Sequence, residues 1–189
     1  MSRGRDRIGW YIGGFAVLAI AMLVLRFFGG SDAPTSRLVG REAPDFTLPV
    51  VAGHGASEEE RVSHAALRGE VVVLDFWASW CQPCRYSIPV MNEIHERYGE
   101  RARVYGVNVE EGVPLRVVER GYRDFGMEFP SLRDQSGVAQ VSYEVQSIPT
   151  VVVIGRDGAV RWVHHGVPSE DDLGDALDEA LAEGPTPRD

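Results

Sequence analysis

The stretch VVVLDFWASWCQPC, residues 71–84, decides the fold. Its first seven residues are nearly all apolar, which predicts a strand buried on both faces. The stretch ends in Cys81 and Cys84, the only two cysteines of the chain. We expect the strand to lead into a helix whose N-terminus holds Cys81, where the helix dipole favours a thiolate. Cys84 then lies one turn further along, placed to attack a mixed disulfide that Cys81 has formed.

Two other roles for the cysteine pair have less support from the sequence. A structural disulfide that closes so short a ring removes little chain entropy from the unfolded state. A structural zinc site usually needs four ligands, and the sequence has neither a second CxxC nor an HxxxH motif. The pair therefore predicts redox chemistry. The Cys81–Cys84 disulfide is the expected redox centre, with no metal and no organic cofactor.

The N-terminus contains a candidate membrane span. From Ile8 to Leu25 the chain is uncharged and mostly aliphatic, and these 18 residues would form a helix of about 27 Å, close to the hydrocarbon thickness of a bilayer. Three arginines precede this run and are offset only by Asp6. The positive-inside rule then leaves the N-terminus in the cytoplasm. The pattern predicts a single-pass inner-membrane protein whose remaining chain lies outside the cytoplasm, in the periplasm.

A cleaved signal peptide is the alternative interpretation of this region. Ser31-Asp32-Ala33 loosely resembles a small-x-small cleavage site. Against cleavage, the apolar run is longer than the hydrophobic part of most signal peptides, and Pro34 directly follows the site. We therefore favour an uncleaved signal anchor over residues 8–28, and the sequence alone leaves cleavage open.

One folded domain with short flanks accounts for the rest of the chain. We expect residues 1–7 in the cytoplasm, 8–28 as the anchor, 29–42 as a linker, 43–184 as the domain and 185–189 as a tail. The whole chain has a net charge of −9, and because residues 1–30 carry four Arg and one Asp, the remainder carries −12. This acidic balance argues against nucleic acid or an anionic membrane surface as a partner.

Sequence patterns outside the cysteine block predict alternating helices and strands. After Cys81, apolar residues recur at helical spacing at Ile88, Met91, Ile94 and Tyr98, with Pro89 inside this predicted helix. Further strands are expected at 103–108, 151–154 and 159–163, helices at 114–125 and 169–181, a helical turn at 63–67, and a solvated loop at 52–63 between two short strands. The pattern predicts an α/β fold with a mixed sheet and helices on both of its faces.

Three segments resemble the thioredoxin superfamily, and within it the membrane-anchored TlpA/ResA/DsbE-like thiol–disulfide oxidoreductases. They are Ala43-Pro44-Asp45-Phe46, the block of residues 72–84, and Ile148-Pro149-Thr150, and the resemblance covers residues 38–183. It implies a thioredoxin-like fold, with a mixed central sheet, an N-terminal strand or hairpin extension, and one transmembrane helix before the domain.

The resemblance also implies roles for single residues near the cysteines. Pro149 would follow a cis peptide bond and pack against the disulfide, and the backbone of Ile148 would face an incoming substrate strand. A proline directly before a strand needs a special reason in any case, although a trans proline at a strand start is the alternative. Trp80 and Pro83 would shape the substrate-binding surface.

Asp75 is an acid within the apolar strand. Burial of a carboxyl group disfavours its charged form, so we expect the pKa of Asp75 to be raised. Its position six residues before Cys81 matches the buried acid of thioredoxin, which implies a general base for the thiol of Cys84. The alternative is that Asp75 points to solvent or caps a neighbouring backbone group.

The implied function is a membrane-tethered periplasmic reductant of protein disulfides. Its partners would be disulfide-bonded proteins, the bilayer through residues 8–28, and a membrane electron donor of the thiol-reducing type. Cytochrome c maturation or oxidase assembly is the process expected for such a family. Ser87 stands where many ResA-like proteins carry a glutamate, which weakens a shared apocytochrome discrimination.

Three other interpretations stay open at this point. The same cysteine pair could form disulfides as an oxidase, or it could be vestigial in an inert interaction domain. A copper chaperone of the Sco type would use His164-His165, although such proteins have a wider cysteine spacing. Glu110 and Glu111 follow the second predicted strand and could lie near the site, but we expect them to be solvated, as loop carboxylates usually are.

Overall fold

The computed structural model describes residues 36–53 and 59–183. No helix in these two ranges is long and apolar enough to cross a bilayer. The predicted cytoplasmic residues 1–7, the signal anchor at 8–28 and the tail at 185–189 lie outside the described residues.

A seven-stranded mixed sheet forms the centre of the domain, with the strand order β2-β1-β5-β4-β3-β6-β7. The interior strand β3 (Val71–Trp77) runs parallel to β4 (Ala102–Asn108) and antiparallel to β6 (Thr150–Ile154). All seven residues of β3 are buried, which explains its almost uninterrupted apolar sequence. The other strands are β1 (Thr47–Ala52), β2 (Arg61–Ser63), β5 (Ser131–Arg133) and β7 (Val160–His165).

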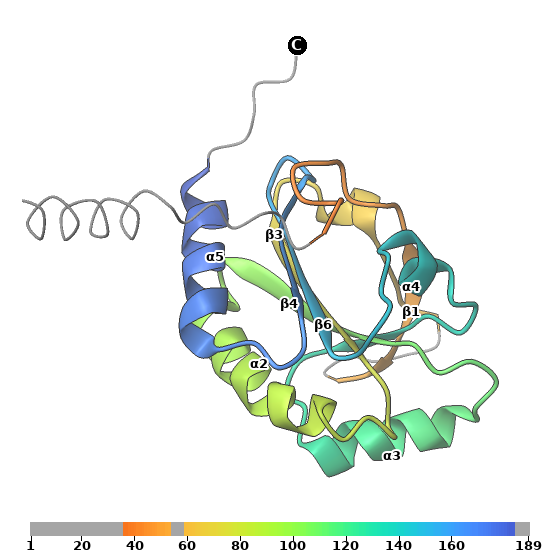
Figure 1. The fold of residues 1–189 in the computed structure, drawn as a ribbon. Coiled ribbons are helices and arrows are strands. Elements are labelled where there is room, and N and C mark those ends of the chain that lie inside the picture. The colour runs from red at the N-terminus through yellow and green to blue at the C-terminus, as the bar shows by residue number, and fades with distance from the viewer. Residues whose placement is uncertain (1–35, 54–58, 184–189) are drawn as a thin grey trace, which may run out of the picture. The chain divides into compact units, whose positions relative to one another are not determined.

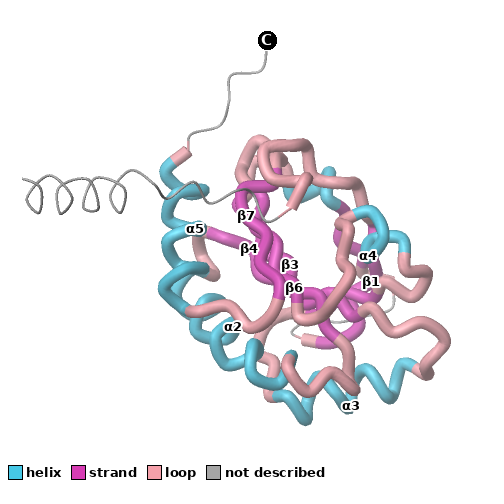
Figure 2. Tube along the Cα trace, viewed as in Figure 1, coloured by secondary structure: helices cyan, strands magenta, loops and turns pink. Residues whose placement is uncertain are grey.

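Helices cover both faces of the sheet, as the sequence predicts. Figure 1 shows α2 (Cys84–Tyr98) and α5 (Glu170–Ala182) together on one side, and α4 (Val138–Ser142) on the other. The two helices on the first side contact each other, and the Tyr98 hydroxyl donates to the Gly174 carbonyl oxygen at 3.5 Å. The helix α3 (Leu115–Phe125) follows β4, and a short 3-10 helix, His64–Leu67, follows β2. Figure 2 shows the same layers by element type.

Aromatic contacts show which face of the sheet each side chain of β3 occupies. The Phe76 ring lies 5.6 Å from the ring of Tyr143, which follows α4. The Trp77 ring lies 5.9 Å from Phe125 of α3. Because successive residues of a strand point to opposite faces, Asp75 shares a face with Trp77. This is the side of α2, since Asn92 of α2 donates to the Gly126 carbonyl at the end of α3 at 2.8 Å.

The N-terminal part of the domain differs from the sequence-based expectation in two places. The strand β2 pairs antiparallel with β1, so the expected hairpin extension is present, but residues 61–63 are strand and not loop. Residues 36–42, expected in the linker, pack along β7: the Gly40 amide donates to the Val160 carbonyl at 2.8 Å, and Leu38 is buried in the core. Burial of the apolar Leu38 side chain and hydrogen bonds to the open edge of β7 stabilise this segment against the domain.

Candidate active site

The turn between β3 and α2 carries both cysteines. The Cys81 amide donates to the Ala78 carbonyl at 3.0 Å, which closes a turn after the strand. The helix α2 begins at Cys84, three residues after Cys81, which was expected at the helix N-terminus. The Arg85 amide reaches the Gln82 carbonyl and the Tyr86 amide reaches the Pro83 carbonyl. Each of these hydrogen bonds spans three residues, so the first turn of the helix is tighter than a regular α-helical turn, whose hydrogen bonds span four.

The two cysteines form a disulfide with an S–S distance of 2.02 Å. The Cys84 amide donates to Cys81 Sγ at 3.1 Å, so the first sulfur lies at the N-terminal end of α2 even though its residue precedes the helix. Cys81 is 2 % exposed and Cys84 is fully buried, whereas Trp80 beside them is 67 % exposed. Cys81 is therefore the residue whose sulfur receives a backbone donor, and it is the slightly more exposed residue of the pair.

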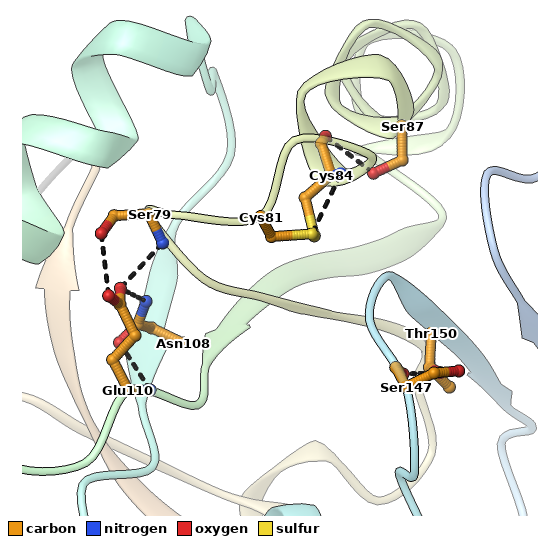
Figure 3. The surroundings of a disulfide bond; sticks show 8 residues. All are labelled: Ser79, Cys81, Cys84, Ser87, Asn108, Glu110, Ser147 and Thr150. Atoms are coloured by element: carbon orange, nitrogen blue, oxygen red, sulfur yellow. Dashed lines mark hydrogen bonds between the residues drawn. A yellow bond between two sulfur atoms is a disulfide. The ribbon is translucent and has the colours of Figure 1, made fainter.

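The peptide bond between Ile148 and Pro149 is cis, as the resemblance implies. The segment around it is fixed by hydrogen bonds: Thr150 Oγ1 donates to the Ser147 carbonyl at 2.6 Å, and the Gly166 amide donates to the Pro149 carbonyl at 2.8 Å. In Figure 3 the disulfide lies between this turn and the side chains of Ser79 and Glu110. The packing of Pro149 against the sulfurs stays a prediction.

A groove of about 510 Å³ lies beside the exposed Trp80. Its walls come from the turn before Cys81, the loop after β4, and the segment before the cis bond. It brings together Trp80 and Ile148, two of the predicted substrate-binding residues, whereas Pro83 and Pro149 are not part of its lining. The lining residues are Trp80, Val109, Glu110, Glu111, Val113, Gln140, Gln146, Ser147 and Ile148.

Asp75 is fully buried, and neither of its carboxylate oxygens has a hydrogen-bond partner among the described residues. Burial raises the pKa of Asp75 from 3.8 to about 8, because the ionised form would lose its hydration without compensation. The prediction of a buried acid with a raised pKa is confirmed. The alternative of a solvent-exposed or capping carboxylate is wrong.

Glu110 differs from the sequence-based expectation in its burial. The expectation of a solvated carboxylate holds for Glu111, which is exposed, but Glu110 is only 4 % exposed. Glu110 Oε2 accepts the Ser79 amide at 2.8 Å, and Oε1 accepts the Ser79 hydroxyl at 2.8 Å. A signal was present in the sequence, because parallel neighbouring strands end at the same edge of a sheet. The residue after β4 therefore lies beside the turn after β3.

The other polar residues considered from sequence have structural partners. Ser87 is buried, and its hydroxyl donates to the Cys84 carbonyl at 3.0 Å. His165 Nδ1 lies 3.0 Å from Thr150 Oγ1, and the His164 ring stacks on Trp162 at 5.2 Å. Within residues 36–53 and 59–183, no three His, Cys, Asp or Glu side chains group as a metal site.

Comparison with known proteins agrees with this geometry. A family model described as the AhpC/TSA family matches residues 39–163. The chain belongs to the AhpC/TSA family. This family member is 35 % identical over 140 residues to the thiol-disulfide oxidoreductase ResA of Geobacillus kaustophilus, over 74 % of this chain and 76 % of the relative. It is 30 % identical to the thioredoxin-like protein YneN of Bacillus subtilis, over 74 % of this chain and 78 % of that one.

Solved structures show the same likeness. A protein from Chlorobium tepidum, assigned as the thiol:disulfide interchange protein DsbE, is 32 % identical and superposes with a TM-score of 0.65, over 75 % of this chain and 96 % of that chain. The predicted resemblance is thus confirmed. With its cysteine pair in place, this member of the AhpC/TSA family is a thioredoxin-like thiol–disulfide oxidoreductase.

Proposed function

We propose that the protein is a membrane-tethered reductant of protein disulfides that works outside the cytoplasm. The observation that carries the redox part is the Cys81–Cys84 pair at the start of α2, where Cys81 Sγ accepts the Cys84 amide at 3.1 Å. A backbone donor directed at a sulfur stabilises the thiolate that attacks a disulfide.

The first chemical step uses the reduced pair. The Cys81 thiolate attacks one sulfur of the substrate disulfide, a new S–S bond joins Cys81 to the substrate, and the second substrate sulfur leaves as a thiolate. Cys81 is suited to this step because it is the more exposed of the two cysteines and because its sulfur lies at the helix N-terminus.

The second step releases the substrate. Cys84 loses its proton and attacks Cys81 Sγ, which forms the Cys81–Cys84 disulfide and frees the other substrate thiolate. The substrate disulfide gains two electrons and, after protonation, becomes two thiols. Asp75 is the proposed acceptor of the Cys84 proton, since it is buried on the sheet face that α2 covers, and its pKa of about 8 suits a base working near neutral pH.

The substrate strand would lie along the segment before the cis bond. Ile148 and the exposed Trp80 line the same groove, so an extended segment next to the substrate disulfide could contact both. Pro83 and Pro149 would border the sulfurs on either side. Backbone groups of Ile148 facing the substrate would accept protein clients of many sequences.

The tether and the reducing direction are argued from the sequence. Residues 8–28 have the length and flanking arginines of a signal anchor with a cytoplasmic N-terminus. A compartment outside the cytoplasm oxidises thiols, so a thioredoxin-like pair there would act as a dedicated reductant, restored by a thiol-reducing electron donor in the inner membrane. Clients in cytochrome c maturation or oxidase assembly fit such a role.

Labelling of single cysteines tests the location. In the full-length Cys84→Ala variant, Cys81 is the one remaining thiol. After reduction, a membrane-impermeant maleimide should label it in intact spheroplasts to the same extent as after lysis, and the protein should sediment with membranes. Labelling that requires lysis would contradict the proposed orientation. Release into the soluble fraction would show that the anchor is cleaved.

A further inference from the structure

Ser79 lies between β3 and the redox pair, and its backbone and side chain are held by one carboxylate. Its amide donates to Glu110 Oε2 and its hydroxyl to Glu110 Oε1, each at 2.8 Å. Asn108 Nδ2 donates to the same Oε2 at 2.9 Å, and the Glu110 amide donates to Asn108 Oδ1 at 3.3 Å. Figure 3 shows this set of contacts next to the disulfide. The carboxylate thus ties the turn after β3 to the end of β4.

The helix α3 also packs directly against Ser79. A Cβ atom placed on Gly121 would lie 2.5 Å from Ser79 Cβ and 3.0 Å from Ser79 Cα, so only glycine allows this approach. The helix α3 is in turn held to α2, where Asn92 Nδ2 donates to the Gly126 carbonyl at 2.8 Å. Ser79 is therefore fixed both by hydrogen bonds and by direct packing, two residues before the sulfur that performs the attack.

We propose that Glu110 is a positioning residue of the redox pair: its hold on Ser79 keeps the Cys81 turn against the N-terminus of α2. The inference rests on the proposed exchange chemistry of Cys81. Its physical basis is that the Cys84 amide stabilises the Cys81 thiolate only while the turn keeps the sulfur within hydrogen-bond reach, 3.1 Å in the disulfide form. Glu110 is buried and satisfied by three donors, which is the environment of a fixed structural acceptor.

Glu110 could act on Cys81 by holding Ser79 in position or by its negative charge. The two cases predict opposite shifts in the pH at which the Cys81 thiolate forms, which makes the proposal testable. If Glu110 acts by position, its removal lets the turn move away from the helix end, and the Cys81 thiolate forms at higher pH. If it acts by its negative charge, removal favours the thiolate, which then forms at lower pH. Glutamine separates the two cases. Its amide oxygen can accept from the Ser79 and Asn108 nitrogens, and its amide nitrogen can donate to the Ser79 hydroxyl.

The experiment compares full-length Glu110→Ala, Glu110→Gln and Ser79→Ala with the wild type, below the melting temperature of each. It records the pH at which Cys81 alkylation is half maximal and the rate of exchange with a small aromatic disulfide at pH 7. Glu110→Ala should raise the midpoint by about one pH unit and slow exchange about threefold, because higher intrinsic nucleophilicity offsets part of a tenfold loss of thiolate. Glu110→Gln should stay within about twofold of the wild type in exchange rate.

Two of the variants, Ser79→Ala and Glu179→Ala, serve as controls for the Glu110 substitutions. Ser79→Ala keeps the amide contact and loses the hydroxyl contact, so its shift should be smaller and in the same direction as that of Glu110→Ala. Glu179→Ala removes an exposed carboxylate of α5 and should match the wild type. A lower midpoint in both Glu110 variants, or an unchanged midpoint in Glu110→Ala, would overturn the positioning role. A wild-type protein without exchange would instead overturn the proposed function itself.

Discussion

Replacing Cys84 with alanine should turn the protein into a trap for its own substrates. The variant keeps Cys81, so the first attack still forms a mixed disulfide, but no second thiol remains in the chain to release it. We expect catalytic reduction of a protein disulfide to fall to the uncatalysed level, together with an adduct that approaches one per protein molecule. Non-reducing electrophoresis and mass spectrometry of the purified full-length variant measure both quantities.

Cys81→Ala is the matched control for this trap. Cys84 is fully buried, so it should not replace Cys81 as the attacking group, and this variant should lose turnover without collecting adducts. Adducts that form through Cys84 would reverse the assigned roles. Normal reduction by Cys81→Ala, with no adduct in Cys84→Ala, would show that the pair does not perform the reaction.

Replacing Asp75 with asparagine should make the oxidised protein more stable at neutral and alkaline pH. The unfolded state releases the Asp75 proton above pH 3.8, whereas the folded state holds it up to about pH 8. Between these values the folded state binds more protons, so the free energy of unfolding of the wild type falls as pH rises, and it levels off above the folded-state pKa. Asparagine does not titrate, and the variant should be more stable at pH 8 by on the order of 5 kcal/mol.

Denaturant unfolding of both proteins from pH 4 to pH 9 measures this difference. The disulfide form is used because its cysteines do not titrate. Near pH 4 the two free energies of unfolding should agree, and the difference should grow toward pH 8. Asp175→Asn, at an exposed position of α5, should keep the wild-type slope. A constant difference between wild type and Asp75→Asn over the whole range would contradict the buried, protonated acid.

The same substitution should slow the resolving step. If Asp75 accepts the Cys84 proton, release of a mixed disulfide in Asp75→Asn should be slower by about 100-fold at neutral pH. The wild-type rate of release should rise up to about pH 8, where Asp75 becomes ionised. An unchanged release rate would leave Asp75 with an effect on stability alone.

Local sequence patterns predicted the elements that depend on neighbouring residues. The apolar run of β3, the helical spacing from Ile88 to Tyr98, and the strands expected at 151–154 and 159–163 all appear in the structure. Asp75 could be identified because a single acid inside a buried strand is costly wherever the strand lies. The cis bond before Pro149 followed from the family resemblance together with the position of a proline before a strand.

The missed features depend on contacts between distant segments. Glu110 is 31 residues from Ser79, and its burial follows from β4 lying beside β3, an order that no local pattern specifies. The packing of residues 36–42 requires β7 to be an open edge of the sheet. The start of α2 at Cys84 follows a turn in which Ser79 is bonded to the distant Glu110.

The reduction potential of the full-length protein tests the central claim most directly. Thioredoxin-like pairs range from about −270 mV for a reductant to about −120 mV for a strong oxidant. Equilibration with dithiothreitol and glutathione buffers, followed by alkylation of free thiols, should show one two-electron transition of the Cys81–Cys84 pair near the reducing end of this range. A midpoint near the oxidising end would make the protein a disulfide-forming oxidase. The absence of any transition would contradict a redox function for the pair.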